Sequence, residues 1–243
     1  MRKKDELEMK IVRPENNVGI HYLKDWIMKK LDKKQEDVKI AICGPLATGK
    51  PYNGIEIGRV CDPNFNIERI TWDPSEFKQK VSGEEYPKGS VFLFENFGID
   101  MSDGQYRTKG ISYLRFLLQE SQSTGKGQIV IVTFEGWYYL KLKVRRLFDL
   151  ILETDREEYG RAKPYISIEF PLDGDRVQLA NLRDEDEKAI DYVKFDEPPD
   201  DFKKKYEKER SSHNRVQIAK SLKALKVPEK EIVRFLNDWE GGA

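Results

Sequence analysis

A short apolar run followed directly by a glycine-rich loop constrains the fold of this chain more than any other feature. Residues 38–43 (VKIAIC) are mostly apolar and rich in β-branched side chains, which is typical of a strand buried on both faces. The loop GPLATGK occupies residues 44–50, and the residues after it are compatible with a helix. Strand, loop and helix in this order predict one unit of an α/β layered domain.

The same alternation continues along the chain. Further strands are predicted at 66–72, 89–98, 128–135 and 149–154, and helices at 110–122, 138–148 and after the cap-like pair Asp73-Pro74. Nearly continuous apolar strands with helices between them imply parallel pairing and right-handed crossovers. The runs 164–172 and 176–182 flank the turn Asp173-Gly174 and predict a β-hairpin that extends or caps the sheet.

Charge divides the chain more clearly than composition does. Lys and Arg number 43, as do Asp and Glu, so the net charge is zero although 35% of residues are charged. Residues 184–201 are strongly acidic, whereas 202–243 hold 11 Lys and Arg against 6 Asp and Glu. We interpret the chain as an N-terminal amphipathic helix region (1–36), an α/β domain with the hairpin (37–183), an acidic linker (184–201) and a basic helical segment (202–243).

Several classes of protein are excluded by the residue inventory. Two cysteines, Cys43 and Cys61, and two histidines, His21 and His213, are too few for a disulfide framework or a zinc site of usual spacing. No run approaches the roughly 18 apolar residues that a membrane span needs, and the first ten residues are charged where a signal peptide is apolar. We therefore expect a cytoplasmic protein without a membrane span.

The glycine-rich loop matches the first seven positions of the phosphate-binding motif GxxxxGK followed by Ser or Thr. Gly44 and Gly49 allow backbone N–H groups to point at an anion, the helix N-terminus adds partial positive charge, and Lys50 supplies an ammonium for the outer phosphates. Thr48 and Tyr52 complete the residues expected to contact nucleotide. The alternative is an ordinary glycine-rich turn that contains a lysine.

Pro51 stands at the eighth position of the motif, where Ser or Thr is expected. This departure removes the hydroxyl that would ligate Mg²⁺ and a backbone N–H that would point at the phosphates. Proline is nevertheless accepted in the first turn of a helix. The fold can thus survive a change that impairs the chemistry.

Strand ends supply the remaining candidate catalytic residues. VFLF (91–94) leads to Glu95, a carboxylate where a metal-organising residue is needed, and then to Asn96, an amide that orients water but cannot take its proton. Thr133 ends the next strand, near the expected position of the γ-phosphate. Arg145 and Arg146 are candidate arginine fingers across a subunit interface. The alternatives are a buried strand with solvent-facing polar residues at its end, and an arginine pair that covers a helix C-terminus.

Together these segments resemble a known family. GPLATGK, GRVCDPNFNIERITWDPSEFKQKV, KGSVFLFENFG, YLRFLLQESQSTGKGQIVIVTFEG and RRLFDLILE are similar, over roughly residues 36–155, to the P-loop ATPases of archaeal viruses, plasmids and integrated elements. These ATPases are related to the zonula-occludens-toxin-like branch of the pumping ATPases. The resemblance implies binding of ATP and Mg²⁺, assembly with further copies, and action on DNA. It places Lys50 at the phosphates, Glu95 at the metal-organising Asp, Asn96 at the catalytic Glu and Thr133 at the sensor position.

The expected fold is a P-loop NTPase-like, mostly parallel α/β sheet flanked by helices, with a β-hairpin extension and a helical C-terminal appendage. In the appendage, two apolar helical faces are separated by Val227-Pro228, with exposed basic residues at Lys220, Lys223, Lys226, Lys230 and Arg234. This pattern is compatible with a helix-turn-helix-like DNA reader. It fits equally a helical hairpin that packs on the domain or mediates oligomerisation.

Two functions follow from the sequence. One is an ATP-dependent, oligomeric DNA motor or packaging-type ATPase, which the intact glycines and Lys50 favour. The other is a non-hydrolysing P-loop-fold structural or DNA-binding subunit, which the departures at Pro51, Glu95 and Asn96 favour. We predict an ATP-binding protein of a mobile element that acts on DNA, with reduced or absent turnover.

Overall fold

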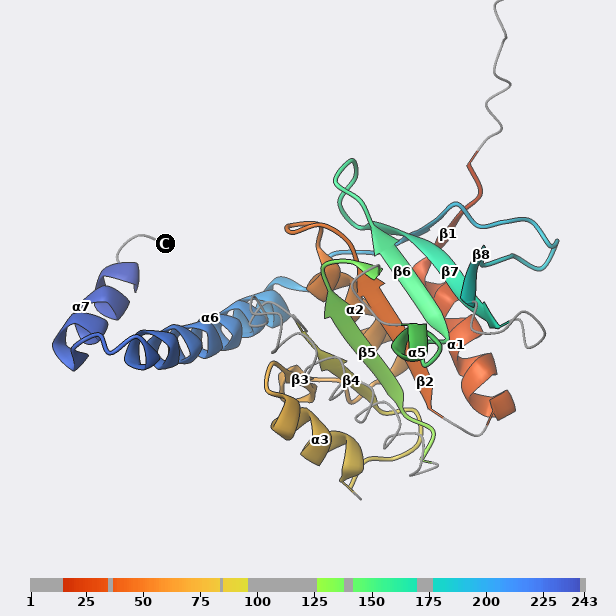
Figure 1. Cartoon of the computed structure of the whole chain (residues 1–243). Coiled ribbons are helices and arrows are strands. Elements are labelled where there is room, and N and C mark those ends of the chain that lie inside the picture. The colour runs from red at the N-terminus through yellow and green to blue at the C-terminus, as the bar shows by residue number, and fades with distance from the viewer. Residues whose placement is uncertain are drawn as a thin grey trace, which may run out of the picture.

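The computed structural model describes residues 15–34, 37–83, 85–95, 126–137, 142–169 and 177–240 (Figure 1). The strands are β1 (Asn17–Gly19), β2 (Val38–Cys43), β3 (Ile70–Thr71), β4 (Val91–Phe94), β5 (Ile129–Phe134), β6 (Leu150–Thr154), β7 (Arg161–Glu169), β8 (Val177–Asn181) and β9 (Tyr192–Lys194). The helices are α1 (Ile20–Lys34), α2 (Lys50–Cys61), the 3₁₀-helix η1 (Ile67–Arg69), α3 (Pro74–Ser82), α5 (Leu142–Arg145), α6 (Asp200–Ala224) and α7 (Glu229–Glu240). Asn96, the predicted helix 110–122 and the turn Asp173-Gly174 lie outside the described residues.

One sheet of nine strands organises the domain. Its order is β1-β9-β7-β6-β2-β5-β4-β3, and β8 pairs with β7 outside this path. The five strands from β6 to β3 are parallel, and β7 joins them antiparallel to β6. The strand that precedes the glycine-rich loop therefore lies in the middle of the parallel part, between β5 and β6.

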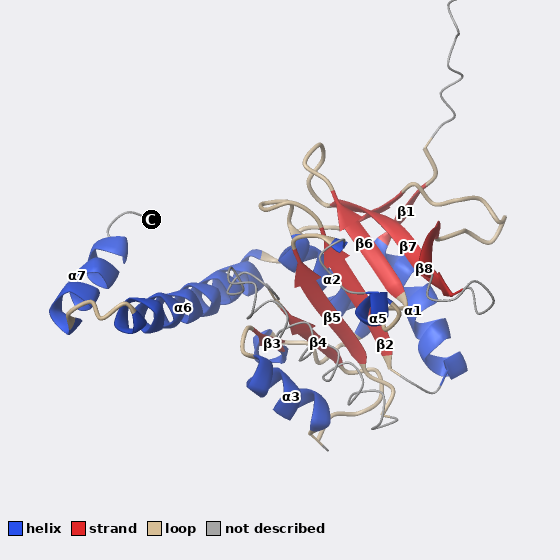
Figure 2. Ribbon diagram, in the orientation of Figure 1, coloured by secondary structure: helices blue, strands red, loops and turns tan. Residues whose placement is uncertain are grey.

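Helices cover both faces of this sheet, as Figure 2 shows. The alternation of side chains along β4 explains why: Val91 and Leu93 pack into the cluster that contains α1 and α2, while Phe92 and Phe94 pack into the cluster that contains α3 and α5. Strands β2 and β5 are buried along their whole length in the same way. Burial on both faces accounts for the continuous apolar runs in the sequence.

Local signals set the bounds of the helices. The α1 helix spans the residues that the apolar spacing predicts. The α3 helix begins after Asp73, whose carboxylate accepts the backbone N–H groups of Ser75 and Glu76, and Pro74 occupies its first turn. The predicted strand 66–72 is shorter than expected, because Asn66 caps η1 and leaves only two residues to β3.

Beyond β6 the sheet becomes antiparallel. The predicted hairpin is confirmed, since β7 pairs with β8 from Tyr165 opposite Asn181 to Glu169 opposite Val177. Residues 184–201, predicted as a linker, instead contribute β9, which pairs with β1 and β7. The acidic side chains around β9 favour a linker in the sequence, whereas in the structure Ile190, Val193 and Phe195 are buried. The division of the chain into domains otherwise stays a prediction.

The basic C-terminal segment forms two helices. The α6 helix runs unbroken through 25 residues, and α7 follows after a short turn that contains Lys226 at a φ of 60°. Figure 1 shows α6 leaving the edge of the sheet near β3 and β4 and carrying α7 at its far end. Tyr206, near the start of α6, is fully buried against the domain.

The predicted fold class is confirmed: a mostly parallel α/β sheet flanked by helices, with a hairpin extension and a helical C-terminal appendage. Among the described residues, no helix combines the length and the apolar character needed to cross a bilayer.

We predict that Ile131→Ala destabilises the domain by about 2–5 kcal/mol, because it opens a cavity in the centre of the sheet. Ile131 is fully buried and lies between Ile40 of β2 and Leu93 of β4. Urea denaturation measures the loss. Leu225→Ala is the control, since Leu225 is 76% exposed and its truncation should change the free energy of unfolding by less than about 0.5 kcal/mol.

Candidate functional site

The glycine-rich loop requires glycine at both glycine positions of the motif for steric reasons. Gly44 follows β2 at a φ of 147°, and a Cβ there would collide with the side chain and carbonyl of Thr154. Gly49 is the N-cap of α2 at a φ of 78°, and a Cβ there would lie 2.7 Å from Cε2 of Tyr159. The loop is thus held close to the end of β6 on one side and to Tyr159 on the other.

Thr48 fastens the loop internally. Its Oγ1 lies 2.9 Å from the carbonyl oxygen of Pro45, to which it donates, and 2.6 Å from Oγ1 of Thr154. Oγ1 of Thr154 also lies 3.1 Å from the carbonyl oxygen of Cys43, and its single proton serves either this carbonyl or Thr48. These buried contacts tie the loop to the ends of β2 and β6, so Thr48 shapes the loop through protein contacts.

Lys50 begins α2 and points back into the loop. Its Nζ donates to the carbonyls of Gly44 and Pro45, at 2.8 and 2.5 Å, and the residue is only 6% exposed. Burial lowers the pKa of Lys50, while Glu135 opposes that shift. An anion in the loop would exchange these carbonyl contacts for stronger charge-assisted bonds to the ammonium.

Pro51 lies in the first turn of α2, as predicted. Backbone N–H groups in the first turn of a helix have no intrahelical partner, so α2 loses no hydrogen bond by having proline there. The N–H of Asn53 bonds to the carbonyl of Gly49 at 3.0 Å. The site nevertheless has no hydroxyl at this position to offer a metal ion.

Glu95 follows β4 and is enclosed by two hydrogen-bond donors and one arginine. Tyr206 Oη and Trp72 Nε1 donate to its Oε2, at 2.6 and 2.7 Å, and Arg210 Nε lies 3.3 Å from its Oε1. The residue is 1% exposed. Burial raises the pKa of Glu95, although the tyrosine, the arginine and the indole each favour the charged form. Oε2 therefore accepts two hydrogen bonds, whereas Oε1 faces the Arg210 guanidinium in an ion pair and accepts no hydrogen bond.

The α6 helix supplies Tyr206 and Arg210 and also forms a wall beside the loop. A cavity of about 160 Å³ lies between them, lined by residues 47–52 and by Tyr159, Tyr206, Glu207 and Arg210. The hydroxyl of Tyr52 donates to Oε1 of Glu207, at 2.5 Å, across this cavity. The glycine-rich loop and α6 thus line one cavity, and Glu95 contacts Tyr206 and Arg210 of its wall.

The structure brings together Gly44, Thr48, Gly49, Lys50, Pro51 and Tyr52 as one loop and helix start, with Glu95 across the cavity behind Tyr206 and Arg210. Thr133 is fully buried in β5, opposite Ile42. Asn96 lies outside the described residues.

The predicted arginine fingers lie away from the cavity beside Lys50. Arg145 ends α5, and its guanidinium lies 5.7 Å from the ring centre of Trp137, on the sheet face that α3 covers. Neither Arg145 nor Arg146 lines the cavity beside Lys50. A role across a subunit interface stays a prediction.

Sequence reasoning missed Trp72, Tyr159, Tyr206 and Arg210. A signal for α6 was present, because Phe202, Tyr206 and Arg210 recur every four residues among lysines and glutamates. That spacing marks one helix face but does not tell what the face covers.

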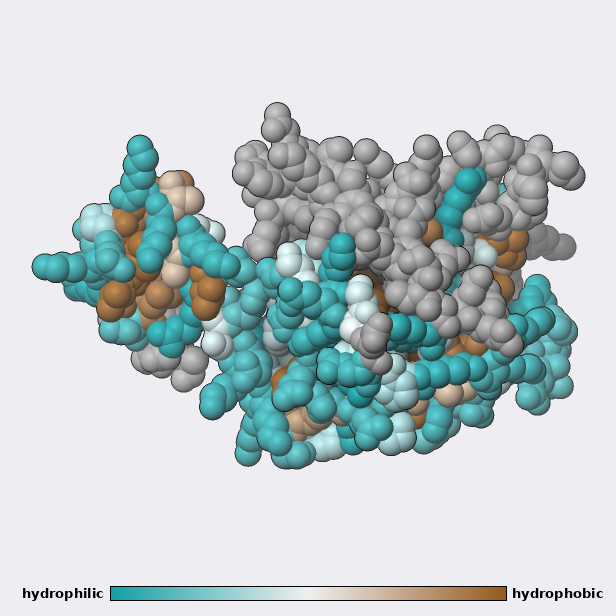
Figure 3. All heavy atoms as spheres, turned by 90° about the horizontal axis from the view of Figure 1, so that it is seen from below, coloured by the Kyte–Doolittle hydropathy of each residue, from teal (hydrophilic) through white to brown (hydrophobic). Residues whose placement is uncertain are grey.

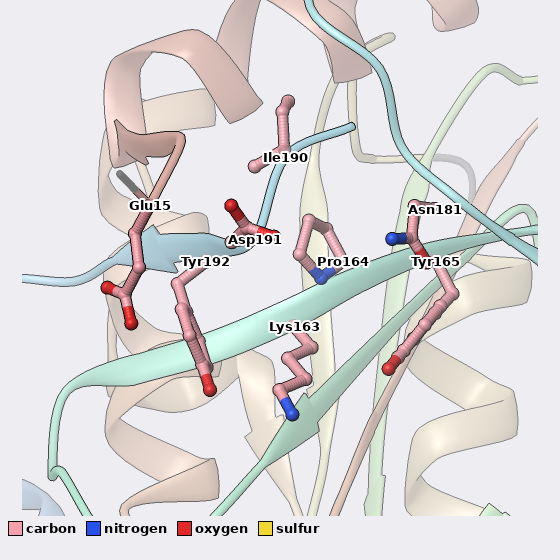
Figure 4. Close-up of a pocket in the computed structure, with 8 residues that line it drawn as sticks. All are labelled: Glu15, Lys163, Pro164, Tyr165, Asn181, Ile190, Asp191 and Tyr192. Carbon is pink, nitrogen blue, oxygen red and sulfur yellow. The ribbon is translucent and has the colours of Figure 1, made fainter. Parts of the chain in front are cut away.

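A larger cavity of about 350 Å³ lies away from the loop, where β7 parts from β9 (Figure 4). Pro164 has no N–H, so the ladder between these strands ends at Ala162 opposite Val193. Figure 4 shows Lys163 pointing out between Tyr165 and Tyr192, with carboxylates of Glu15 and Asp191 nearby. This mixed charge and the lack of a glycine loop make it a poorer fit for phosphate than the cavity beside Lys50.

No family model and no curated protein matches the sequence. Among solved structures, a DNA polymerase III gamma subunit-related protein from Thermotoga maritima is 13% identical, with a TM-score of 0.37 over 57% of this chain. The chain spans 46% of that protein's length. The N-terminal domain of zonular occludens toxin from Neisseria meningitidis is 13% identical, with a TM-score of 0.35, over 62% of this chain and 96% of that one.

A third structure, the HORMA:CdnC:Trip13 complex of E. coli MS115-1, contains a chain that is 14% identical, with a TM-score of 0.36, over 57% of this chain and 58% of that one. We assign a P-loop NTPase-like fold on the basis of this chain's own strand order and its β2–loop–α2 unit.

We predict that Glu95→Gln changes how stability depends on pH. Burial holds the native pKa of Glu95 above the unfolded value of about 4.3, so its contribution to the free energy of unfolding is largest below that value and falls as pH rises through the native pKa. Urea denaturation between about pH 4 and pH 8 should therefore show the native chain losing stability relative to Glu95→Gln as pH rises. A difference that stays constant with pH contradicts this.

Proposed function

We propose that this chain is an ATP-binding P-loop protein in which hydrolysis is reduced or lost, and that it acts in the cytoplasm on DNA of a mobile element. The phosphate half of the site supports binding. Gly44 and Gly49 keep the backbone open around Lys50, and α2 directs its first N–H groups toward the loop.

The metal half of the site does not fit Mg²⁺. Pro51 offers no hydroxyl, and Glu95 is committed to Tyr206, Trp72 and Arg210. Pro51 is the observation that carries the proposal, because the loop has no hydroxyl to ligate Mg²⁺ whether or not α6 is docked. While α6 is docked, Glu95 is also 1% exposed and occupied by its protein contacts. We therefore derive no hydrolytic step through a metal ion.

We predict that native protein binds ATP and does not turn it over above the uncatalysed rate. Lys50→Ala should weaken binding about tenfold or more, because it removes a charge-assisted contact to phosphate. Isothermal titration with and without EDTA measures the affinity, and phosphate release measures turnover. Lys29→Ala, an exposed lysine on α1, is the matched control and should bind as the native chain does.

Two results would contradict the proposal. Turnover that Lys50→Ala abolishes would mean that the chain is an active ATPase. Absence of binding both in the native chain and in Pro51→Ser/Asn96→Glu would remove the nucleotide assignment as a whole.

The proposal of DNA binding is supported by α6 and α7. The two helices are joined by a turn at 225–228, and the side chains of Lys220, Lys223, Lys226, Lys230 and Arg234 are exposed. Exposed basic residues on a helical pair attract a phosphate backbone.

Self-association is the competing use of the same helices. Apolar side chains gather over the α6–α7 end of the molecule in Figure 3, and the exposed ones are Val216, Leu225, Val233 and Phe235. Exposed apolar side chains that gather in this way favour contact with protein. Both uses are compatible if the apolar residues join copies and the lysines face DNA.

We predict that Lys220→Gln/Lys226→Gln weakens binding to duplex DNA and lowers the slope of log affinity against log salt by up to about 2, because each phosphate contact contributes about 0.9. Fluorescence anisotropy across a salt series measures the slope. Lys29→Gln/Lys33→Gln removes the same charge from α1 and should leave the slope nearly unchanged. Equal slopes for the two variants would reject a DNA-binding role for these lysines.

A further inference from the structure

The α6 helix forms one wall of the cavity beside Lys50. At about 160 Å³ it is smaller than the pockets of about 300–1,000 Å³ that take drug-sized ligands. Tyr206, Glu207 and Arg210 form the wall opposite the loop. While α6 is docked, the space between the loop and this helix is therefore too small for a whole nucleotide, although a second cavity of about 360 Å³ lies along Ala47, Thr48 and Tyr159 on a side that α6 does not line.

Glu207 makes α6 an electrostatic competitor as well as a steric one. Its carboxylate accepts a hydrogen bond from the Tyr52 hydroxyl at the start of α2, and Nη1 of Arg210 lies 3.8 Å from its Oε1. This places negative charge at the mouth of a loop whose geometry suits phosphate. The phosphates of a nucleotide in the loop would be repelled by the Glu207 carboxylate, because both are negatively charged.

The contacts that seat α6 extend over its first half. The ring of Phe202 stacks on Phe65, with centroids 6.0 Å apart, and His213 stacks on Trp72, with centroids 5.5 Å apart. Trp72 also stacks on Tyr206. Beyond His213 the helix extends away from the sheet (Figure 1), and Val216 is half exposed. A short stripe of aromatic contacts thus holds a long helix.

We infer that α6 is a latch on the phosphate-binding loop: its docking and the binding of a nucleotide exclude each other, so that a bound nucleotide releases α6 and α7 from the domain. The inference rests on the proposed nucleotide binding. A nucleotide binds only the fraction of molecules in which α6 is undocked, and its apparent affinity is reduced by that fraction. Any change that loosens α6 without touching the cavity should therefore tighten binding.

Phe202→Ala/His213→Ala makes that change, because both residues seat α6 and neither lines the cavity. We expect this variant to bind ATP about threefold more tightly or better than the native chain, by isothermal titration. Lys208→Ala/Glu209→Ala is the matched control, since both side chains are exposed on the same helix, and its affinity should equal that of the native chain.

Hydrogen exchange measured by mass spectrometry gives a second readout on the native chain. Adding ATP should speed amide exchange in residues 200–213, and the Phe202→Ala/His213→Ala variant should show fast exchange there without ATP. Lys50-dependent ATP binding with unchanged exchange in α6 overturns the latch but leaves the proposed function standing. Absence of ATP binding in all these variants overturns both.

Discussion

A buried carboxylate determines how the two ends of this chain are joined. Glu95 is 1% exposed at the end of β4, where an ionised group without partners would be strongly unfavourable. Trp72 donates one hydrogen bond from the segment after β3, Tyr206 donates another from α6, and Arg210 of α6 supplies an opposite charge 3.3 Å away. Leaving a buried charge without its partner costs about 3–5 kcal/mol, so α6 is positioned by the need to satisfy Glu95.

The contacts that enclose Glu95 are separate from those that shape the glycine-rich loop. The loop keeps its shape through contacts that do not involve Glu95, namely Thr48 with Thr154 and the glycine positions beside them. Lys50 is held by loop carbonyls that an anion can replace. A carboxylate that serves protein contacts is therefore compatible with an intact glycine-rich loop.

The sequence predicted the parts of the fold that depend on local patterns. Continuous apolar runs indicated β2, β4, β5 and β6, and Asp73-Pro74 indicated the start of α3. The contact between Glu95 and Tyr206 joins residues 111 positions apart, and no periodicity within either segment specifies it. Strand β9 was taken for a linker because three residues are too few to outweigh the acidic side chains around them.

The order of events at the site follows from which contacts are mutually exclusive. Tyr206 and Arg210 can satisfy Glu95 only while α6 is docked, and Glu207 then faces the loop. Undocking exposes Glu95 to water, which stabilises its charge and reduces the need for those partners. If α6 is the latch inferred above, a ligand that binds α6–α7 and favours the undocked helix raises nucleotide affinity, and nucleotide raises the affinity for that ligand by the same factor, because coupling is reciprocal. Because α7 is attached to the end of α6 beyond His213, it moves whenever the seated first half of α6 is displaced.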